Sequence, residues 1–145
     1  MNLRNLISGT RLTPAADVGL LLGRLIFGVS LALAHGIGKI PPDPGFATRV
    51  GEMGFPAPTL FAWLAALAET LGAFLIAIGL LTRPAALFVT LHFLFVVFLA
   101  HAGDPFGDRE RAVLFLTLAL VFLFTGAGRY SADAVIDRSP RAGSH

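Results

Sequence analysis

The chain contains no cysteine and little charge, and both shortages narrow what kind of protein it can be. Without cysteine it forms no disulfide and offers no thiolate nucleophile, iron–sulfur cluster or cysteine-ligated zinc site. Only 14% of its 145 residues are charged and 55% are hydrophobic, whereas soluble domains carry about 25% charged residues. The same figures exclude disorder, because disordered chains combine low hydrophobicity with high net charge. The composition predicts an integral membrane protein.

Lysine is also scarce, and this bears on nucleic-acid binding. Lys39 is the one lysine in the chain, and the arginines are scattered along it. Binding to nucleic acid would require basic residues gathered on one face. We therefore expect no nucleic-acid partner, and the lipid bilayer is the partner that the composition indicates.

Four apolar runs approach the length of about 20 residues that a membrane span needs. Their predicted ranges are about 18–38, 57–81, 84–101 and 110–127. A cleavable signal peptide is the competing interpretation of the first run, but its length and Arg24 count against it. Apart from a loop at 41–55 the connections are short, so neighbouring helices must be antiparallel. The sequence predicts an all-α, integral-membrane, up-down four-helix bundle.

This bundle is predicted to form a single membrane domain over residues 1–138. Residues 139–145 are predicted to be a flexible tail, with an expression remnant at its end as one interpretation. Four spans place both termini on one side of the membrane. The basic residues on that side are Arg4, Arg11, Arg83, Arg129, Arg138 and Arg141. The opposite side has Lys39, Arg49, Arg109 and Arg111. Because cytoplasmic loops carry more positive charge, the sequence predicts cytoplasmic termini.

Three ionisable residues fall inside the predicted spans: Arg24, Glu69 and His92. Such residues cost about 2.5–3.5 kcal/mol or more at mid-membrane, so their presence needs a reason. At about 1.5 Å per residue their depths are close enough for contact. We expect Arg24 to pair with Glu69, with His92 beside them, and we assign Glu69 and His92 as candidate catalytic residues that move protons. The alternative is a structural ion pair that fixes helix packing.

A second polar set lies toward the opposite face of the membrane. His35 and His101 match in depth, and Lys39 follows His35 by one helical turn, near the helical stripe that contains Arg24. This pattern predicts a polar cavity that opens to the extracytoplasmic side. Its candidate substrate-binding residues are Arg24, His35, Lys39, His101 and Glu110. The alternative is a set of interfacial residues that reach the lipid headgroups.

Neither haem nor a metal ion is expected as a cofactor. His92 and His101 are nine residues apart, which places them on opposite sides of a regular helix, so at most one of them faces a given site. A metal site built from His35, His101 and Asp104 lacks close ligand spacing.

Small residues recur at helical spacing in the first run, including the pair Gly19 and Gly23. Such stripes let helices approach closely in lipid. We interpret this stripe as a packing surface within the bundle, with a homo-oligomer as the alternative.

Short motifs follow one another in a fixed order between about residues 18 and 133. They are Gly23-Arg24-Leu25-Ile26-Phe27-Gly28, His35-Gly36-Ile37-Gly38-Lys39, Gly54-Phe55-Pro56-Ala57-Pro58, Ala68-Glu69-Thr70-Leu71-Gly72, Gly79-Leu80-Leu81-Thr82-Arg83, His101, Glu110-Arg111-Ala112 and Gly126-Ala127-Gly128-Arg129-Tyr130-Ser131-Ala132-Asp133. In order and spacing the chain resembles the DoxX family. Ala132 stands where the family more commonly has leucine.

The resemblance implies a multi-pass protein of the bacterial inner membrane. Some members of the family are the membrane subunit of a thiosulfate:quinone oxidoreductase, and others are linked to redox or thiol-stress complexes. This implies a quinone as the cofactor and a redox protein as a partner. A family name supports the fold more strongly than the reaction, so the function must be argued from the site.

Three functions remain open at this point. The first is a redox-linked protein that binds a quinone or small substrate in the cavity and receives electrons from a partner or a small reductant. The second is a non-enzymatic membrane anchor or assembly partner of a redox complex. The third is a pathway for a small solute or proton. Whether the chain is an enzyme is left undecided by the sequence; if it is one, we expect an oxidoreductase subunit that acts on quinone.

Overall fold

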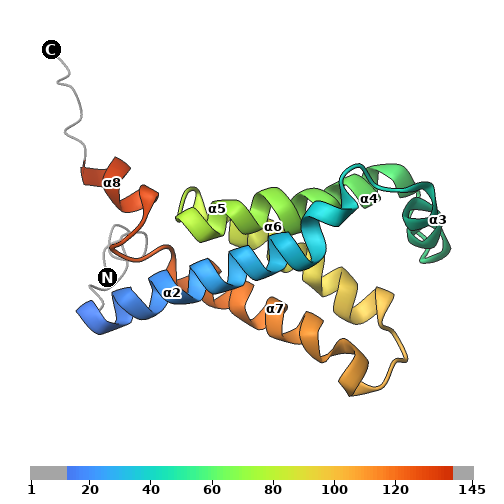
Figure 1. Ribbon diagram of the computed structural model, residues 1–145. Coiled ribbons are helices and arrows are strands. Elements are labelled where there is room, and N and C mark those ends of the chain that lie inside the picture. Colours follow the sequence, from blue (N-terminus) through green and yellow to red (C-terminus); the bar gives the residue numbers. More distant parts are fainter. Residues whose placement is uncertain (1–12, 139–145) are drawn as a thin grey trace, which may run out of the picture.

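The computed structural model describes residues 13–138, and every regular element within that range is helical (Figure 1). The all-α prediction is confirmed for this part of the chain. The predicted tail at 139–145 lies outside the described residues, as do Arg4, Arg11 and Arg141.

Four long helical segments run back and forth through the molecule. The first is α2 (Pro14–Leu31), continued by η1 (Ala32–Gly36) and η2 (Ile37–Lys39). The second is α4 (Pro58–Leu67), η3 (Ala68–Gly72) and α5 (Ala73–Ile78). The third is α6 (Thr82–Phe95) with η4 (Val96–Ala100), and the fourth is α7 (Phe106–Thr125). The segments η1, η3 and η4 are π-helical, and η2 is a 3-10 turn.

Three of these segments are long and apolar enough to cross a membrane, namely 14–39, 58–78 and 82–100. They lie near the predicted spans 18–38, 57–81 and 84–101. The fourth segment, α7, has 20 residues, but four charged residues stand in its first two turns. The structure thus has three candidate membrane spans among the described residues, and the fourth crossing stays a prediction.

The connection between the first two segments is more ordered than the predicted loop at 41–55. It contains the helix α3 (Pro44–Glu52). The Asp43 side chain accepts a hydrogen bond from the Phe46 N–H at 2.9 Å, and Pro44 occupies the first turn. An aspartate cap followed by proline is a typical helix start, because each suits the unpaired backbone groups found there. The prediction of a plain loop was therefore wrong over these nine residues.

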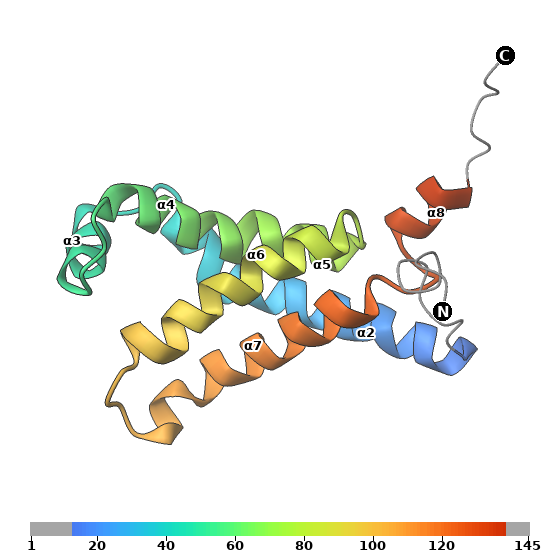
Figure 2. The same cartoon turned by 180° about the vertical axis from the view of Figure 1, so that it is seen from behind.

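The long segments pack in the order in which they occur along the chain. α2 lies beside α5, α5 beside α6, α6 beside α7, and α7 also contacts α2. The start of α2 and the short helix α8 (Ala132–Arg138) lie at one end of the molecule, and α3 and the turn between η4 and α7 lie at the other (Figures 1 and 2). We call the latter the α3 end.

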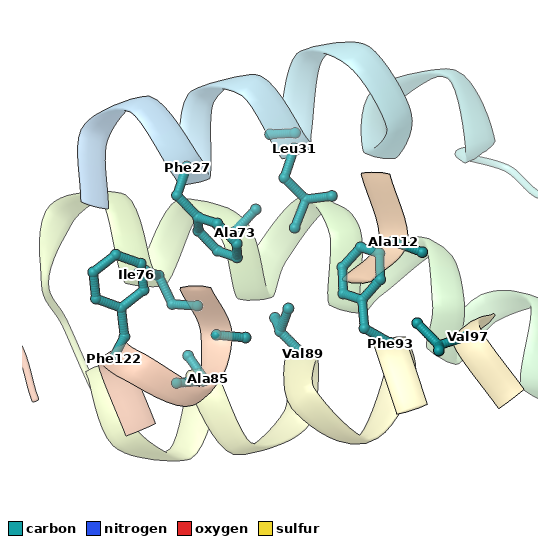
Figure 3. Close-up of a cluster of buried hydrophobic side chains, with 13 residues drawn as sticks. Phe27, Leu31, Ala73, Ile76, Ala85, Val89, Phe93, Val97, Ala112 and Phe122 are labelled. Atoms are coloured by element: carbon teal, nitrogen blue, oxygen red, sulfur yellow. The ribbon is translucent and has the colours of Figure 1, made fainter. Parts of the chain in front are cut away.

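A continuous apolar core joins all four segments (Figure 3). Phe27 of α2 meets Phe122 of α7 edge to face, with 5.4 Å between ring centroids. Ile76 of α5 and Val89 of α6 are fully buried in the same core. Many large apolar side chains point outward instead, among them Ile26, Phe98 and Phe124. An apolar outer surface of this extent is typical of helices that contact lipid.

The end opposite α3 is held together by a group of buried or half-buried polar residues that we call the Arg24 cluster: Asp17, Arg24, Ser131 and Asp133. The Arg24 guanidinium donates to the main-chain oxygens of Tyr130 at 2.6 Å and Ile76 at 3.4 Å. Asp17 accepts a bond from the Arg129 N–H at 2.9 Å. Asp133 accepts from the N–H groups of Leu81 and Thr82, which begin α6.

Gly79 makes this arrangement possible. Its φ of +71° ends α5 in the left-handed conformation, which glycine adopts readily. A Cβ atom at this position would collide with the Arg24 guanidinium and the Ser131 side chain. The sequence at 126–133 therefore folds back over the end of α5, and the motif there has a structural role.

Candidate functional site

A cavity of about 500 Å³ lies at the α3 end. Its walls come from α3, α4, α6 and α7 and from the end of the first segment, and they are mainly apolar. Seven phenylalanines contribute to the walls: Phe46, Phe55, Phe61, Phe88, Phe93, Phe95 and Phe115. Several of their rings meet in pairs, such as Phe93 stacked on Phe115 with 5.4 Å between centroids. The cavity therefore offers flat, apolar surfaces to a ligand.

The base of the cavity holds a buried carboxylate. Glu69 is 4% exposed, and Lys39 Nζ donates a hydrogen bond to its Oε2 atom. His92 Nε2 lies 2.8 Å from the other oxygen, Oε1. We call Lys39, Glu69 and His92 the Glu69 cluster. Both carboxylate oxygens are thus held by side chains that come from the other two candidate spans.

The three π-helical segments all carry the chain past this cavity. His35 belongs to η1, Glu69 belongs to η3, and His101 directly follows η4. Hydrogen bonds from residue i+5 to residue i mark the extra residue in each turn, as in the 3.0 Å bond from the His101 N–H to the Val96 oxygen. Isolated π turns inside α-helices are frequent at functional sites.

Two of these π segments meet closely beside the Glu69 cluster. Gly36 in η1 packs on η3, and a Cβ atom at this position would collide with the Glu69 main-chain oxygen and the Thr70 hydroxyl. The absence of a side chain at Gly36 allows the first span to approach the second at the level of the carboxylate. This close approach brings His35 and Lys39 to the cavity.

The π segment η4 also corrects the prediction that His92 and His101 cannot face one site. Both residues line the cavity. In a regular α-helix nine residues would turn them about 180° apart, but the extra residue in η4 reduces the angle to about 80°. The prediction was wrong because it assumed α-helical geometry throughout.

Several polar residues line the cavity near the turn between η4 and α7, and we call this part of the cavity its mouth. His101 Nδ1 lies 2.8 Å from Asp104 Oδ2, which orients the ring from the turn before α7. His35 packs edge-on against Phe115, with 5.6 Å between ring centroids. Asp108 and Arg111, from the start of α7, also line the cavity. Sequence reasoning missed these two, although their spacing of three residues places them on one face of the helix.

The expected pair of Arg24 and Glu69 is absent. Arg24 belongs to the Arg24 cluster at the far end and does not line the cavity. The depth estimate was wrong because it took the start of the first span and the end of the second to lie at the same level, whereas α2 extends well past the end of α5 (Figure 1). His35 also lies within the π segment η1, whose wider turn rotates it away from the stripe of Arg24.

Glu110 also lies apart from the cavity lining, on the exposed side of α7. The structure brings five of the predicted site residues together around the cavity: His35, Lys39, Glu69, His92 and His101. Their roles in binding or proton transfer stay predictions. Among residues 13–138, no group of three or more histidine, aspartate or glutamate residues is arranged to hold a metal ion.

These features define a class: a helical membrane protein with an apolar cavity whose bottom holds a buried carboxylate. Comparison with known proteins agrees with it. The DoxX family model matches residues 19–102, more than half of the chain, and the protein belongs to the DoxX family. A protein of Bacillus subtilis (strain 168) named "Putative oxidoreductase CatD" is 26% identical over 129 residues, which cover 88% of this chain and 94% of that relative. No solved structure matches the chain at a significant level.

Proposed function

We propose that this DoxX protein binds a quinone in the cavity at the α3 end and takes part in its reduction. The observation that carries the proposal is the Glu69 cluster, a buried carboxylate at the base of an aromatic cavity. Ionisable residues inside a membrane protein are costly and commonly mark a functional site. The oxidoreductase name of the Bacillus subtilis relative supports a redox role.

The residues at the base suit a quinone chemically. A quinone ring needs apolar surfaces on its faces and hydrogen-bond donors for its two carbonyl oxygens. Phenylalanine rings provide the surfaces, and Lys39, His92 and His35 provide donors. The volume of about 500 Å³ lies within the range of roughly 300–1,000 Å³ that is usual for ligand sites.

Reduction of a quinone to a quinol consumes two electrons and two protons. Lys39 and His92 can each hold a proton beside Glu69, and His92 is the residue type that exchanges protons near neutral pH. The chain has no cysteine, so it supplies no dithiol as the electron donor. The two electrons must come from a small reductant or a partner protein that approaches the mouth near His101.

The same proposal includes four crossings of the bacterial inner membrane with cytoplasmic termini. The charges of α7 are confined to its first turns, and residues 112–125 are uncharged and mainly apolar, so this helix can serve as the fourth span. The cavity then opens to the extracytoplasmic side. Reporter fusions within 41–55 should give an extracytoplasmic signal, and a cytoplasmic signal there would reverse the orientation.

The anchor role and the pathway role are the competing functions. The apolar core between the Glu69 and Arg24 clusters, including Phe27, Ile76 and Phe122, is fully packed. This counts against a polar route across a single chain. An anchor or assembly partner would need no ligand in the cavity, so a direct binding measurement separates it from the proposed function.

Binding can be measured through Trp63, the single tryptophan of the chain, which precedes the cavity-lining Leu64. A decyl-substituted benzoquinone should quench its fluorescence in lipid nanodiscs. Glu69→Gln should raise the Kd at least tenfold, and His35→Ala should raise it less. Glu52→Gln, an exposed carboxylate of α3 that does not line the cavity, is the matched control. An unchanged Kd in Glu69→Gln would contradict the proposal, and no binding to the wild type would favour the anchor role.

A further inference from the structure

Four of the large apolar side chains that line the cavity are exposed: Met53, Leu64, Leu91 and Phe95. Met53 follows α3, whereas the other three belong to candidate membrane spans, Leu64 to α4 (36% exposed) and Leu91 and Phe95 to α6 (48% and 47%). These three exposed side chains make the part of the cavity wall between α4 and α6 apolar.

The packing of the helices explains why this part of the wall is exposed. α4 packs mainly on α3 and η3, whereas α6 packs mainly on α7, η3 and α5. The second and third segments are in contact where His92 of α6 reaches Glu69 of η3. From there α4 and α6 spread apart toward the α3 end, as Figures 1 and 2 both show. The Phe55 and Phe95 rings, with 5.5 Å between centroids, line the widening space between them.

The lining of the cavity also includes exposed charged residues. The exposed lining residues Asp108 and Arg111 stand at the start of α7, and His101 lies close by in the sequence. Charged groups are stable where water reaches them, and large exposed apolar groups are stable against lipid. The lining of this one cavity thus combines exposed groups that suit lipid with exposed groups that suit water.

We propose that the cavity takes its ligand sideways from the bilayer, between α4 and α6, and that the ligand carries a hydrocarbon chain. The polar head of the ligand lies at the Glu69 cluster, and its chain leaves the cavity along Leu64, Leu91 and Phe95. The water-facing mouth is then left for the electron donor. This inference rests on the proposed function, and it adds the ligand class and the route of entry.

The test compares two probes that share a ring: a decyl-substituted benzoquinone and the same benzoquinone with a methyl group in place of decyl. Binding is followed by Trp63 quenching in nanodiscs. Leu91→Gln places a polar amide on the proposed route and should raise the Kd of the decyl probe about tenfold. It should change the Kd of the methyl probe less than twofold. Leu87→Gln is the control, because Leu87 is 47% exposed on the same helix and does not line the cavity.

A second pair of variants guards against a folding defect. Phe95→Ala should weaken the binding of the decyl probe selectively. Phe98→Ala should not, because Phe98 is exposed and lies outside the cavity lining. Equal effects of Leu91→Gln and Leu87→Gln, or equal losses of the two probes, would overturn the lateral route. The proposed function would then still hold if both probes depend on Glu69. If Glu69→Gln leaves the Kd of both probes unchanged, the proposed function and the lateral route are both rejected.

Discussion

Among residues 13–138 the most deeply buried charges belong to the Arg24 cluster and the Glu69 cluster, yet the partners of these charges differ in kind. Arg24, Asp17 and Asp133 bind main-chain oxygens and N–H groups, so each ties one stretch of backbone to another. Glu69 binds only the side chains of Lys39 and His92 and faces a cavity. Backbone partners cannot turn away, whereas side-chain partners can change rotamer and accept a ligand. The first cluster is built to hold the chain, and the second is free to exchange partners.

The largest effect should follow from removing Arg24. Arg24→Ala removes the donor to the Tyr130 oxygen and the longer bond to the Ile76 oxygen, which keeps its bond from the Gly79 N–H, and it opens a void in a fully buried site. We expect a loss of about 3 kcal/mol in the free energy of unfolding, the size typical of breaking a buried polar contact. Unfolding by sodium dodecyl sulfate in mixed micelles, followed by circular dichroism, gives this value. A loss below about 1 kcal/mol would mean that Arg24 does not hold the end of α5.

A double-mutant cycle tests whether the two clusters are independent. Lys39→Met and Glu69→Gln should show a coupling energy of about 1–2 kcal/mol, because the two side chains share an ion pair. Arg24→Ala and Glu69→Gln should add within about 0.5 kcal/mol. The measurement is the unfolding free energy of each single and double variant. Strong coupling between Arg24 and Glu69 would restore the pairing that the sequence predicted.

A smaller effect should follow from removing the carboxylate that caps α6. Asp133→Ala takes away the acceptor for the Leu81 and Thr82 N–H groups and should cost about 1 kcal/mol in unfolding free energy. Quinone binding should be unchanged, since Asp133 lies in the Arg24 cluster. Asp137→Ala, on the exposed side of α8, is the control and should have no effect on either quantity. A change in Kd with Asp133→Ala would link the two ends of the molecule.

The smallest effect is expected at the mouth. Asp104→Asn weakens the contact with His101, and this pair is partly exposed. Exposed pairs contribute about 0.2–1 kcal/mol, so the unfolding free energy should fall by less than about 0.5 kcal/mol. The same micelle titration measures this difference. A loss as large as that of Asp133→Ala would show that the mouth also has a structural role.

Hydropathy and turn residues were sufficient to predict the three candidate spans, although not the short helices α3 and α8. The three candidate spans follow from apolar runs in which few ionisable residues stand: Asp17, Arg24, His35, Lys39, Glu69, Arg83 and His92. Residue type also pointed to the cavity, because an ionisable side chain inside a span needs a partner. Five of the seven candidate site residues accordingly lie around one space.

The errors arose where local geometry departs from a regular helix. Arg24 was placed beside Glu69 because depth was counted along helices assumed to be flush at their ends, and no residue pattern shows how far α2 extends past α5. The angle between His92 and His101 was misjudged because no sequence signal marked η4 as π-helical. Asp108 was missed because its helix was expected to begin near residue 110, whereas it begins at Phe106. Arg111 lay within the predicted span but was not recognised as a site residue.

The π turns have a consequence for how such a cavity can arise. Each of η1, η3 and η4 amounts to one residue more than an α-helix needs over the same length. Losing a single codon from one of these turns would keep the span, its hydropathy and its direction, but would swing the following side chains by about 100°. The interior chemistry of the protein can therefore be gained or erased by single-residue insertions and deletions, while its outline in the membrane stays the same.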